Sequence, residues 1–223
     1  MCIKKLIWDS DFFNFEIGEI TENSNLENAN DFNLLVLKQS KESNVIIDNF
    51  ENSFQETKII FRKTIDTIIG TIDVEDADFE SLTPNYLYDL AYESGKHSRF
   101  LLDKNFRENQ FKELYQKWID NSLNKQFADK IFYTKKENKI TGFVSVKKQD
   151  NFATIGLIAV DSEQQGQGIG RILIQKVEQY CTNNHISELR IPTQKENQQA
   201  CHFYTKNGYT ILEETIIKHY WKI

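Results

Sequence analysis

The most regular hydrophobic pattern in the chain runs from residue 154 to residue 180. It opens with the apolar run 155–160, whose length and composition predict a strand buried on both faces. Polar residues at 161–164 end that run. Apolar residues then recur at spacings of three and four, which predicts one face of a helix: Ile169, Ile172, Leu173, Val177 and Tyr180. The stretch therefore predicts a strand, a turn and a helix in that order.

Similar patterns predict elements along the rest of the chain. Helices are expected at 30–43, 86–93, 105–126 and 196–206, and strands at 44–48, 58–62, 67–72, 130–134, 140–146, 152–160, 187–192, 209–212 and 216–221. The two strands after residue 130 form one hairpin, and the last two strands form another. The helix at 105–126 carries an apolar stripe that we assign to core packing: Phe111, Leu114, Tyr115, Trp118, Ile119 and Leu123.

The chain of 223 residues is long enough for one large domain or two small ones. Its first part carries clustered phenylalanines, expected to pack a small core, but no chemical motif. The acidic stretch 73–78, followed by Pro84, marks a boundary. We therefore expect a small N-terminal α/β domain at 1–82 and a second domain at 83–223.

Three glycines occupy alternate positions where the predicted central helix begins, at Gly166, Gly168 and Gly170. Without Cβ atoms, the backbone there can be approached closely, and the first amides of a helix favour an anion such as phosphate. Each hydrogen bond from a backbone amide to a charged phosphate oxygen contributes roughly 1.5–3 kcal/mol. The loop lacks the Lys-Ser/Thr end of a P-loop, and its last glycine comes too early for a dinucleotide fingerprint. An ordinary glycine-rich turn is the alternative.

Charge and cysteine content narrow the class of protein. The net charge of −6 argues against general nucleic-acid binding, so an anionic ligand needs a local positive site. Three cysteines without metal-ligand spacing favour a reducing, cytoplasmic location. The four histidines form no metal motif, and no run of 18 apolar residues or signal-peptide core is present. We expect a cytoplasmic protein without metal, nucleic-acid partner or membrane insertion.

A second motif lies in the predicted last helix. Residues 197–209 read NQQACHFYTKNGY, which fits Asn-x-x-Ala-x-x-Phe/Leu-Tyr-x-x-x-Gly-Phe/Tyr. The earlier loop fits Gln/Arg-x-x-Gly-x-Gly/Ala through Gln165, Gly168 and Gly170. With both motifs in this order, the chain from about residue 85 onward resembles the GCN5-related N-acetyltransferase (GNAT) superfamily.

This resemblance implies the α/β GNAT fold, with a mixed central sheet and acetyl-CoA held at the strand–loop–helix unit. It implies that Tyr204 is the general acid for the CoA thiolate. The cofactor-binding residues it implies are Ile158, Ala159, Val160, Gln165, Gly166, Gln167, Gly168, Ile169, Gly170, Arg171 and Asn197.

The implied reaction is direct attack of an amine on the thioester carbonyl of acetyl-CoA. The amine must lose a proton, and the developing oxyanion needs a donor, for which an amide of strand residues 158–160 is the natural choice. The same strand edge would pair with the pantetheine arm. The base is not identified: Asp161, Glu163 and His202 are candidates, each more typical of a structural role.

Four further segments resemble the branch that acetylates dTDP-4-amino-4,6-dideoxygalactose. They are residues 6–8 with 12–13, 98–100, 115–121 and 189–194. Arg99 would then meet the sugar-nucleotide phosphates, with a surface ion pair as the alternative. The small-molecule acceptor would be a nucleotide-linked amino sugar, and whether its amine is at C4 or C3 is left open. Alternatives are a peptide N-terminus, a polyamine or an antibiotic as acceptor, or a non-catalytic acyl-CoA-binding module. Homodimerisation is left open.

Overall fold

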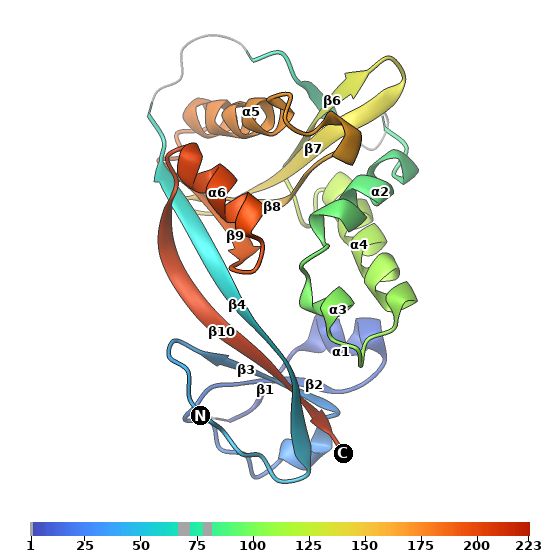
Figure 1. The fold of residues 1–223 in the computed structure, drawn as a ribbon, viewed down its shortest axis with the longest axis vertical. Helices are drawn as coiled ribbons and strands as arrows, with labels where there is room; N and C mark the ends of the chain where they lie inside the picture. The colour runs from blue at the N-terminus through green and yellow to red at the C-terminus, as the bar shows by residue number, and fades with distance from the viewer. Residues whose placement is uncertain (1, 67–71, 78–81) are drawn as a thin grey trace.

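A single ten-stranded sheet runs through the whole molecule (Figure 1). The computed structural model describes residues 2–66, 72–77 and 82–223. The strands follow the order β1-β2-β3-β10-β4-β9-β8-β7-β6-β5. Their bounds are β1 Lys4–Lys5, β2 Ile17–Ile20, β3 Leu34–Gln39, β4 Phe50–Thr64, β5 Glu75–Ala77, β6 Lys130–Lys136, β7 Lys139–Lys148, β8 Ala153–Val160, β9 Glu188–Gln194 and β10 Thr210–Lys222. Only β2 with β3 and β8 with β9 pair in parallel, so in the described residues the sheet is mixed.

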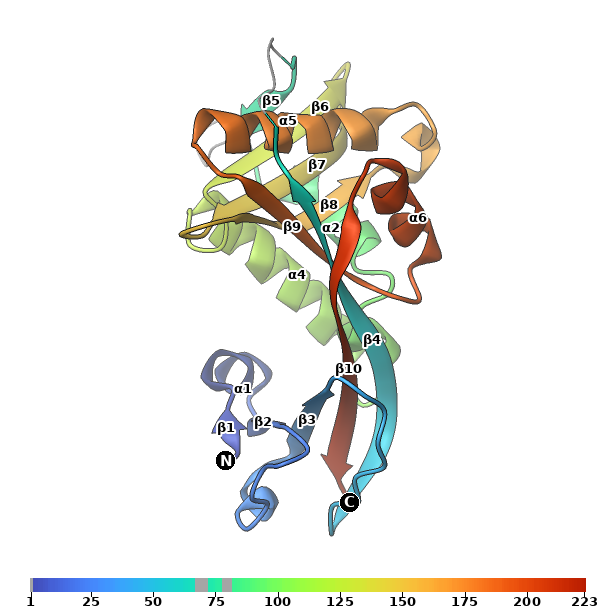
Figure 2. The same cartoon turned by 90° about the vertical axis from the view of Figure 1, so that its left-hand side faces the viewer.

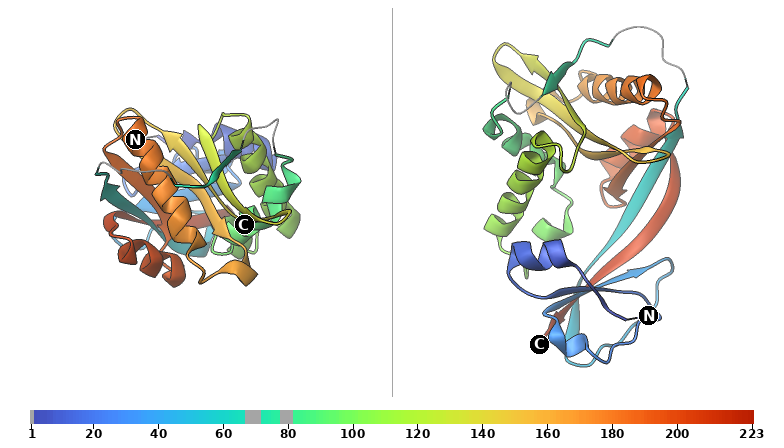
Figure 3. Two further views of the ribbon diagram at one scale, coloured as in Figure 1. Left: turned by 90° about the horizontal axis from the view of Figure 1, so that it is seen from above. Right: turned by 180° about the vertical axis from the view of Figure 1, so that it is seen from behind.

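Helices cover the sheet on both faces (Figures 1 and 3). They are α1 Ile7–Phe13, α2 Asn85–Ser94, α3 Arg99–Leu102, α4 Glu108–Leu123, α5 Ile169–Asn183 and α6 Gln198–Lys206, with 3₁₀ turns η1 Ala29–Asp31 and η2 Ser162–Gln164. The apolar faces of α2 and α4 pack in one core cluster, and that of α5 packs in another together with Phe61 and Val144. The central part of the sheet is therefore covered by α2 and α4 on one face and by α5 on the other.

Two long strands, β4 and β10, join the two ends of the molecule (Figure 2). They pair antiparallel from Thr210 opposite Arg62 to Lys222 opposite Phe50. At the lower end, β10 also pairs with β3, beside β1, β2 and α1. Strands from both sides of residue 82 thus share one sheet, and the division into two domains at that residue stays a prediction.

Most of the elements predicted after residue 83 are confirmed. The structure has α2, α4, the β6–β7 hairpin, β8, α5, β9 and α6 where the periodicity predicts them, with ends that differ by a few residues. The stripe on α4 is buried, apart from the half-buried Trp118. On α5, Ile172 is exposed and Ile174 takes its place in the core. The clustered phenylalanines form no separate N-terminal core, because Phe13 stacks on Phe100 of α3.

The predicted helix at 30–43 is wrong. That segment forms the turn η1 and the strand β3, whose residues 34–37 are buried side by side. β3 lies between β2 and β10, so both of its faces and both of its edges are covered. Four consecutive apolar residues satisfy such a strand, whereas a helix would expose part of them. The strand predicted at 44–48 is also absent, because that segment is irregular and Ile46 is 89% exposed.

The predicted C-terminal hairpin is also wrong, because β10 is one continuous strand. Glu213 and Glu214 lie in a part of β10 that pairs with β4 but not with β3. Polar side chains are tolerated on such an open edge, and a bulge at Leu212 absorbs one extra residue. The strand predicted at 67–72 lies, except for Ile72, outside the described residues.

A buried polar cluster ties α3 to β10. Asp103, which ends α3, contacts His219 Nδ1 through Oδ2 at 2.6 Å, and the same oxygen accepts a hydrogen bond from Trp221 Nε1 at 2.8 Å. Burial lowers the pKa of His219 below its ordinary value of 6.5, although the bond to Asp103 opposes that shift. His219 is therefore neutral in the folded protein, and Nδ1 donates to the Asp103 carboxylate.

We predict that this histidine makes the protein sensitive to mild acid. Below the ordinary pKa of 6.5, the unfolded chain binds a proton that buried His219 resists, so the free energy of unfolding falls as pH falls. His219→Gln should lower the free energy of unfolding at about pH 7.5 by roughly 1–3 kcal/mol, and the gap to wild type should narrow at about pH 5.5. Urea denaturation at both pH values measures this.

His202→Gln, at an exposed histidine, is the matched control, and its free energy of unfolding should change with pH as that of the wild type does. If the difference in free energy of unfolding between wild type and His219→Gln is the same at both pH values, the proposed role of His219 protonation is contradicted.

Candidate active site

The sheet opens at one place, between β8 and β9. These parallel strands pair only at Ala153 with Leu189 and at Thr154 with Arg190. Beyond Thr154 they separate, while β8 stays paired with β7 as far as Val160. The β8 edge from residue 155 onward is therefore free of β9, and its backbone groups can bind an extended ligand.

A cleft of about 1040 Å³ occupies this opening and continues toward α1 and α3. Its volume is close to the upper end of the range for small-molecule pockets, roughly 300–1,000 Å³. On β8, Ile155 and Ala159 are buried, but Gly156 is exposed and residues 157, 158 and 160 are half-buried, so the expectation of a strand buried on both faces is wrong for β8. The cleft thus extends from β8 as far as α3.

β8 also carries a bulge inside the cleft. Its pairing with β7 shifts between Val144 opposite Ile158 and Val146 opposite Ile155. In the bulge, the Leu157 amide donates to Ser145 Oγ at 2.9 Å. A bulge bends its strand and redirects neighbouring groups. Residues 158–160 follow it directly and line the cleft.

The glycine loop has the backbone that its sequence predicts. Gly166 and Gly168 have φ of 78° and 85°, in the left-handed region that other residues avoid. A Cβ atom on Gly168 would meet no atom within 4 Å, so the space beside it is open. Gly170 lies close to α6, because a Cβ there would be 3.2 Å from Phe203. The N-terminus of α5 thus lines the cleft, with open space beside Gly168.

The structure brings nearly all predicted cofactor-binding residues to one cleft. Those lining it are Ile158, Ala159, Val160, Gln165, Gly166, Gly168, Ile169, Gly170, Arg171 and Asn197. Gln167 is exposed and does not line it. Asn197 has a structural role as well, since its Oδ1 accepts from the Ala200 amide and caps α6. The individual roles of these residues stay predictions.

Tyr204 lies on α6 at the wall of the same cleft. Its ring packs against Phe61 and Phe203, with centroids 5.4 and 5.5 Å away. Burial raises the pKa of Tyr204 far above its ordinary value. The hydroxyl accordingly keeps its proton at neutral pH and can donate it or a hydrogen bond.

None of the three candidate bases lines the cleft. Asp161 pairs with Lys139 at 2.7 Å and caps η2, and the hydrogen bond from that lysine lowers the pKa of Asp161. Glu163 and His202 are exposed. All three therefore lie outside the lining of the cleft, and the identity of the base stays open.

Charged residues from the N-terminal part of the chain form the far end of the cleft. Arg99 lines this end and forms an ion pair with Glu56 of β4, with Nη1 3.3 Å from Oε1, while its contact with a phosphate stays a prediction. Lys58 from the same strand and Asp9 from α1 join them. Sequence analysis missed Asp9, Glu56 and Lys58, because an isolated charged residue in a helix or strand has the pattern of a solvent-facing position.

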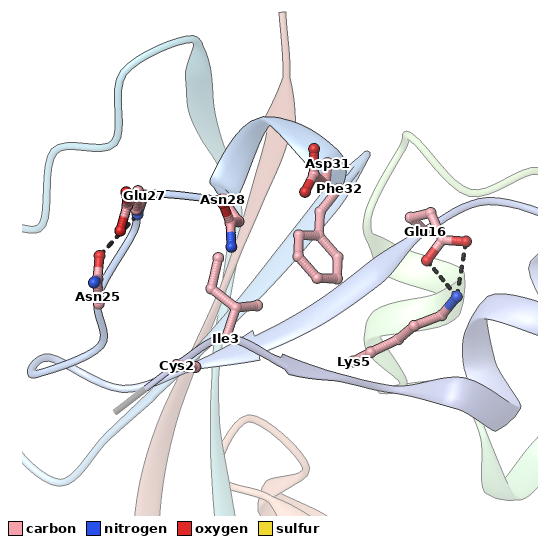
Figure 4. Close-up of a pocket in the computed structure, with 9 residues that line it drawn as sticks. All are labelled: Cys2, Ile3, Lys5, Glu16, Asn25, Glu27, Asn28, Asp31 and Phe32. Atoms are coloured by element: carbon pink, nitrogen blue, oxygen red, sulfur yellow. Dashed lines mark hydrogen bonds and ion pairs between the residues drawn. The ribbon is translucent and has the colours of Figure 1, made fainter.

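A second, smaller pocket of about 410 Å³ lies near the start of the chain (Figure 4). Figure 4 shows that Lys5 pairs with Glu16 on one side, and Asn25 with the Glu27 backbone on the other. Its charged groups are exposed. Within residues 2–66, 72–77 and 82–223, no group of three metal-ligating side chains occurs, and no helix is both long and apolar enough to span a membrane.

Comparison with protein families agrees with this geometry. Residues 99–209 match the model of the acetyltransferase (GNAT) family. The match includes the free edge of β8, the glycine loop and Tyr204. A GNAT-family structure from Novosphingobium aromaticivorans has a TM-score of 0.56 at 9% identity, covering 85% of this chain and 74% of that one. At this identity the likeness concerns the fold alone.

Two curated relatives come from Bacillus subtilis. Streptothricin acetyltransferase A is 29% identical over 122 residues, which are 54% of this chain and 69% of that protein. The spore coat polysaccharide biosynthesis protein SpsD is 27% identical over 134 residues, or 60% of this chain. The chain spans less than half of SpsD, 46% of its length.

The glycine loop yields a direct prediction. Gly168→Glu should lower the affinity for acetyl-CoA by roughly 100-fold or more, because it adds strain at a positive φ and sets a carboxylate in the anion site. Isothermal titration calorimetry measures this, with thermal unfolding to verify the fold. The exposed Gln149→Glu adds the same charge at a residue that does not line the cleft and should change affinity little. Retained affinity in Gly168→Glu would remove the loop from the binding site.

Proposed function

Because the chain is an acetyl-CoA-dependent acetyltransferase with the GNAT fold, we propose that its acceptor is the amine of a nucleotide-linked sugar. The specific acceptor class proposed is a dTDP-4-amino-4,6-dideoxy sugar. The amine attacks the thioester carbonyl directly, the C–S bond breaks, and Tyr204 acts on the departing CoA thiolate. The proposal has a donor half, a reacting centre and an acceptor half.

In the donor half, acetyl-CoA lies along β8. The pantetheine arm pairs with the free edge at residues 158–160, and the pyrophosphate lies on the glycine loop at the N-terminus of α5. Three features support this arrangement: the short pairing of β8 with β9, the positive φ of two loop glycines, and the open space beside Gly168. An amide of residues 158–160 then donates to the developing oxyanion.

At the reacting centre, the buried Tyr204 hydroxyl interacts with the sulfur. A thiol has an ordinary pKa of about 8.5, well below that of a buried tyrosine. Tyr204 therefore stabilises the thiolate chiefly as a hydrogen-bond donor, and it transfers its proton only where bound ligands bring the two pKa values together. The amine loses its proton to water in the cleft.

In the acceptor half, Lys58 is the observation that carries the nucleotide-sugar proposal. It lines the cleft beside Arg99 and forms no ion pair with any residue in the described ranges. Burial lowers the pKa of Lys58, and the like charges of Lys38 and Arg99 lower it further. A bound phosphate would relieve this repulsion, and the Arg99 guanidinium retains donors beyond the one directed at Glu56.

A basic antibiotic is the second candidate acceptor, because Asp9 and Glu56 also line this end of the cleft. Two carboxylates beside two cations leave the local charge balanced, so a cationic amine is accommodated as well. One relative is named for streptothricin and another for a spore coat polysaccharide, which supports testing both classes.

Thiol release from acetyl-CoA by the purified protein tests the proposal. The panel contains dTDP-4-amino and dTDP-3-amino sugars, streptothricin, a polyamine and a peptide with a free N-terminus. Turnover confined to the nucleotide sugars is the expected result. Preference for streptothricin, the polyamine or the peptide would overturn the acceptor assignment and leave the donor chemistry intact.

Tyr204→Phe should lower kcat by roughly 10–100-fold, because the thiolate loses its donor. Affinity for acetyl-CoA should change little, since the ring and its packing are retained. Steady-state kinetics and calorimetry measure the two effects. Tyr180→Phe, on α5 and outside the cleft, is the control and should keep wild-type kcat. An unchanged kcat in Tyr204→Phe would exclude Tyr204 as the acid.

Lys58→Ala and Arg99→Ala should each raise KM for a nucleotide sugar by roughly 10-fold or more, because each removes a charge-assisted bond to phosphate. In Lys58→Ala, KM for an acceptor without phosphate should stay near the wild-type value, and this difference between the two kinds of acceptor is the decisive measurement. The exposed Lys104→Ala controls for general loss of positive charge. Equal changes for acceptors with and without phosphate would contradict phosphate binding.

A further inference from the structure

Glu56 lies at the acceptor end of the cleft but has no place in the chemistry described above. It belongs to β4, opposite Ile217 of β10, and only 3% of its surface is exposed. Lys58, two residues further on, points to the same side of the sheet. A carboxylate at such a buried position needs partners for both of its oxygens.

Only one oxygen of Glu56 has a partner. Oε1 accepts a hydrogen bond from Arg99 Nη1 at 3.3 Å. Oε2 is buried and has no hydrogen-bond partner among the described residues. Burial raises the pKa of Glu56, and the neighbouring Arg99 opposes that shift without cancelling it. An unpartnered acceptor of this kind is unfavourable unless a bound ligand supplies the missing donor.

The location of Glu56 decides which part of a ligand it can meet. Phe61 of the same strand contacts the ring of Tyr204. Glu56 precedes Phe61 by five residues, so their Cα atoms lie about 16 Å apart along an extended strand and their side chains point to opposite faces of the sheet. This placement sets Glu56 apart from the ring of Tyr204. It fits a part of the acceptor that does not react.

We propose that Glu56 is a specificity-determining residue, whose Oε2 accepts a hydrogen bond from a hydroxyl or N–H group on the non-reacting part of the acceptor. This inference rests on the proposed function, since it assumes a polar acceptor in this half of the cleft. Arg99 has a double role here: it holds Glu56 Oε1 and so directs Oε2, while its other donors remain free for phosphate.

Other charged groups around Glu56 do not take the place of this ligand. Lys58 and Arg99 are the nearby cations, and Glu196, which accepts from the Thr57 amide at 3.3 Å, adds negative charge from the segment before α6. A negative neighbour disfavours an anionic ligand group at Oε2 itself. The missing partner is therefore a donor, either neutral or cationic.

Glu56→Gln is a sharp test because Arg99 can only donate hydrogen bonds. The carbonyl oxygen of the substituted side chain must face Arg99, which places its amide NH₂ group where Oε2 was. The variant keeps the size of the side chain and the contact with Arg99, but it turns the free acceptor into a donor. Glu51→Gln, on the exposed part of the same strand, is the matched control.

The experiment uses the best acceptor of the panel and a series of analogues, each with one non-reacting hydroxyl or N–H donor replaced by a group that cannot donate. For the full acceptor, Glu56→Gln should lower kcat/KM by roughly 100-fold, mostly through KM, because an unmatched buried polar group discriminates strongly. For one analogue, which lacks the recognised donor, the variant should differ from wild type by less than about threefold. KM for acetyl-CoA and the rate of Glu51→Gln should stay near wild type.

Two results would overturn the inference: a variant within about threefold of wild type for the full acceptor, or an equal loss with every analogue, which indicates a structural effect. Calorimetric titration of the same acceptors into wild type and Glu56→Gln measures their affinities, and so the coupling between Glu56 and each acceptor group, without turnover. If none of the acceptors supports thiol release, the proposed function is defeated, and the titration still tests Glu56. Absence of binding by the whole series would defeat both.

Discussion

The separation of β8 from β9 is the feature on which the site depends. Two adjacent parallel strands would ordinarily continue their hydrogen bonds, yet these two pair only at their first residues. The sheet remains stable because β8 keeps its bonds to β7 and β9 keeps its bonds to β4. The opening therefore sacrifices few backbone bonds, and it creates the cleft, the free strand edge and the exposed start of α5 together.

The second half of the site comes from another part of the chain. β4 begins beside the N-terminal strands and ends beside β9, so one strand reaches both the lower end of the molecule and the cleft. Lys58 and Glu56 lie on it, and Arg99 reaches them from α3. Residues 99–209 match the GNAT family model, whereas the residues of β4 lie outside that match. The cleft is thus lined both by residues inside that match and by residues of β4 outside it.

This distribution of the cleft residues along the sequence explains which parts of the site could be predicted from sequence alone. The glycine loop and the last helix are encoded in consecutive residues, so their positions could be derived before the structure, although the role of Tyr204 stays a prediction. β3 was mistaken for a helix because its coverage by β2 and β10 depends on residues far away in the chain. Glu213 and Glu214 suggested a turn because the open edge of β10 cannot be seen locally. Glu56 and Lys58 escaped notice for the same reason, since only tertiary pairing turns their face of β4 toward the cleft.

The position of β10 has a consequence for biosynthesis. β10 lies between β3 and β4 in the sheet although it follows them far along the sequence, so β3 and β4 cannot complete their pairing until residues 210–222 have been synthesised. Contacts between residues so distant in sequence form slowly, and unpaired strand edges favour aggregation in the meantime. The part of β4 that lines the cleft is therefore fully paired only after β10 has been added to the sheet.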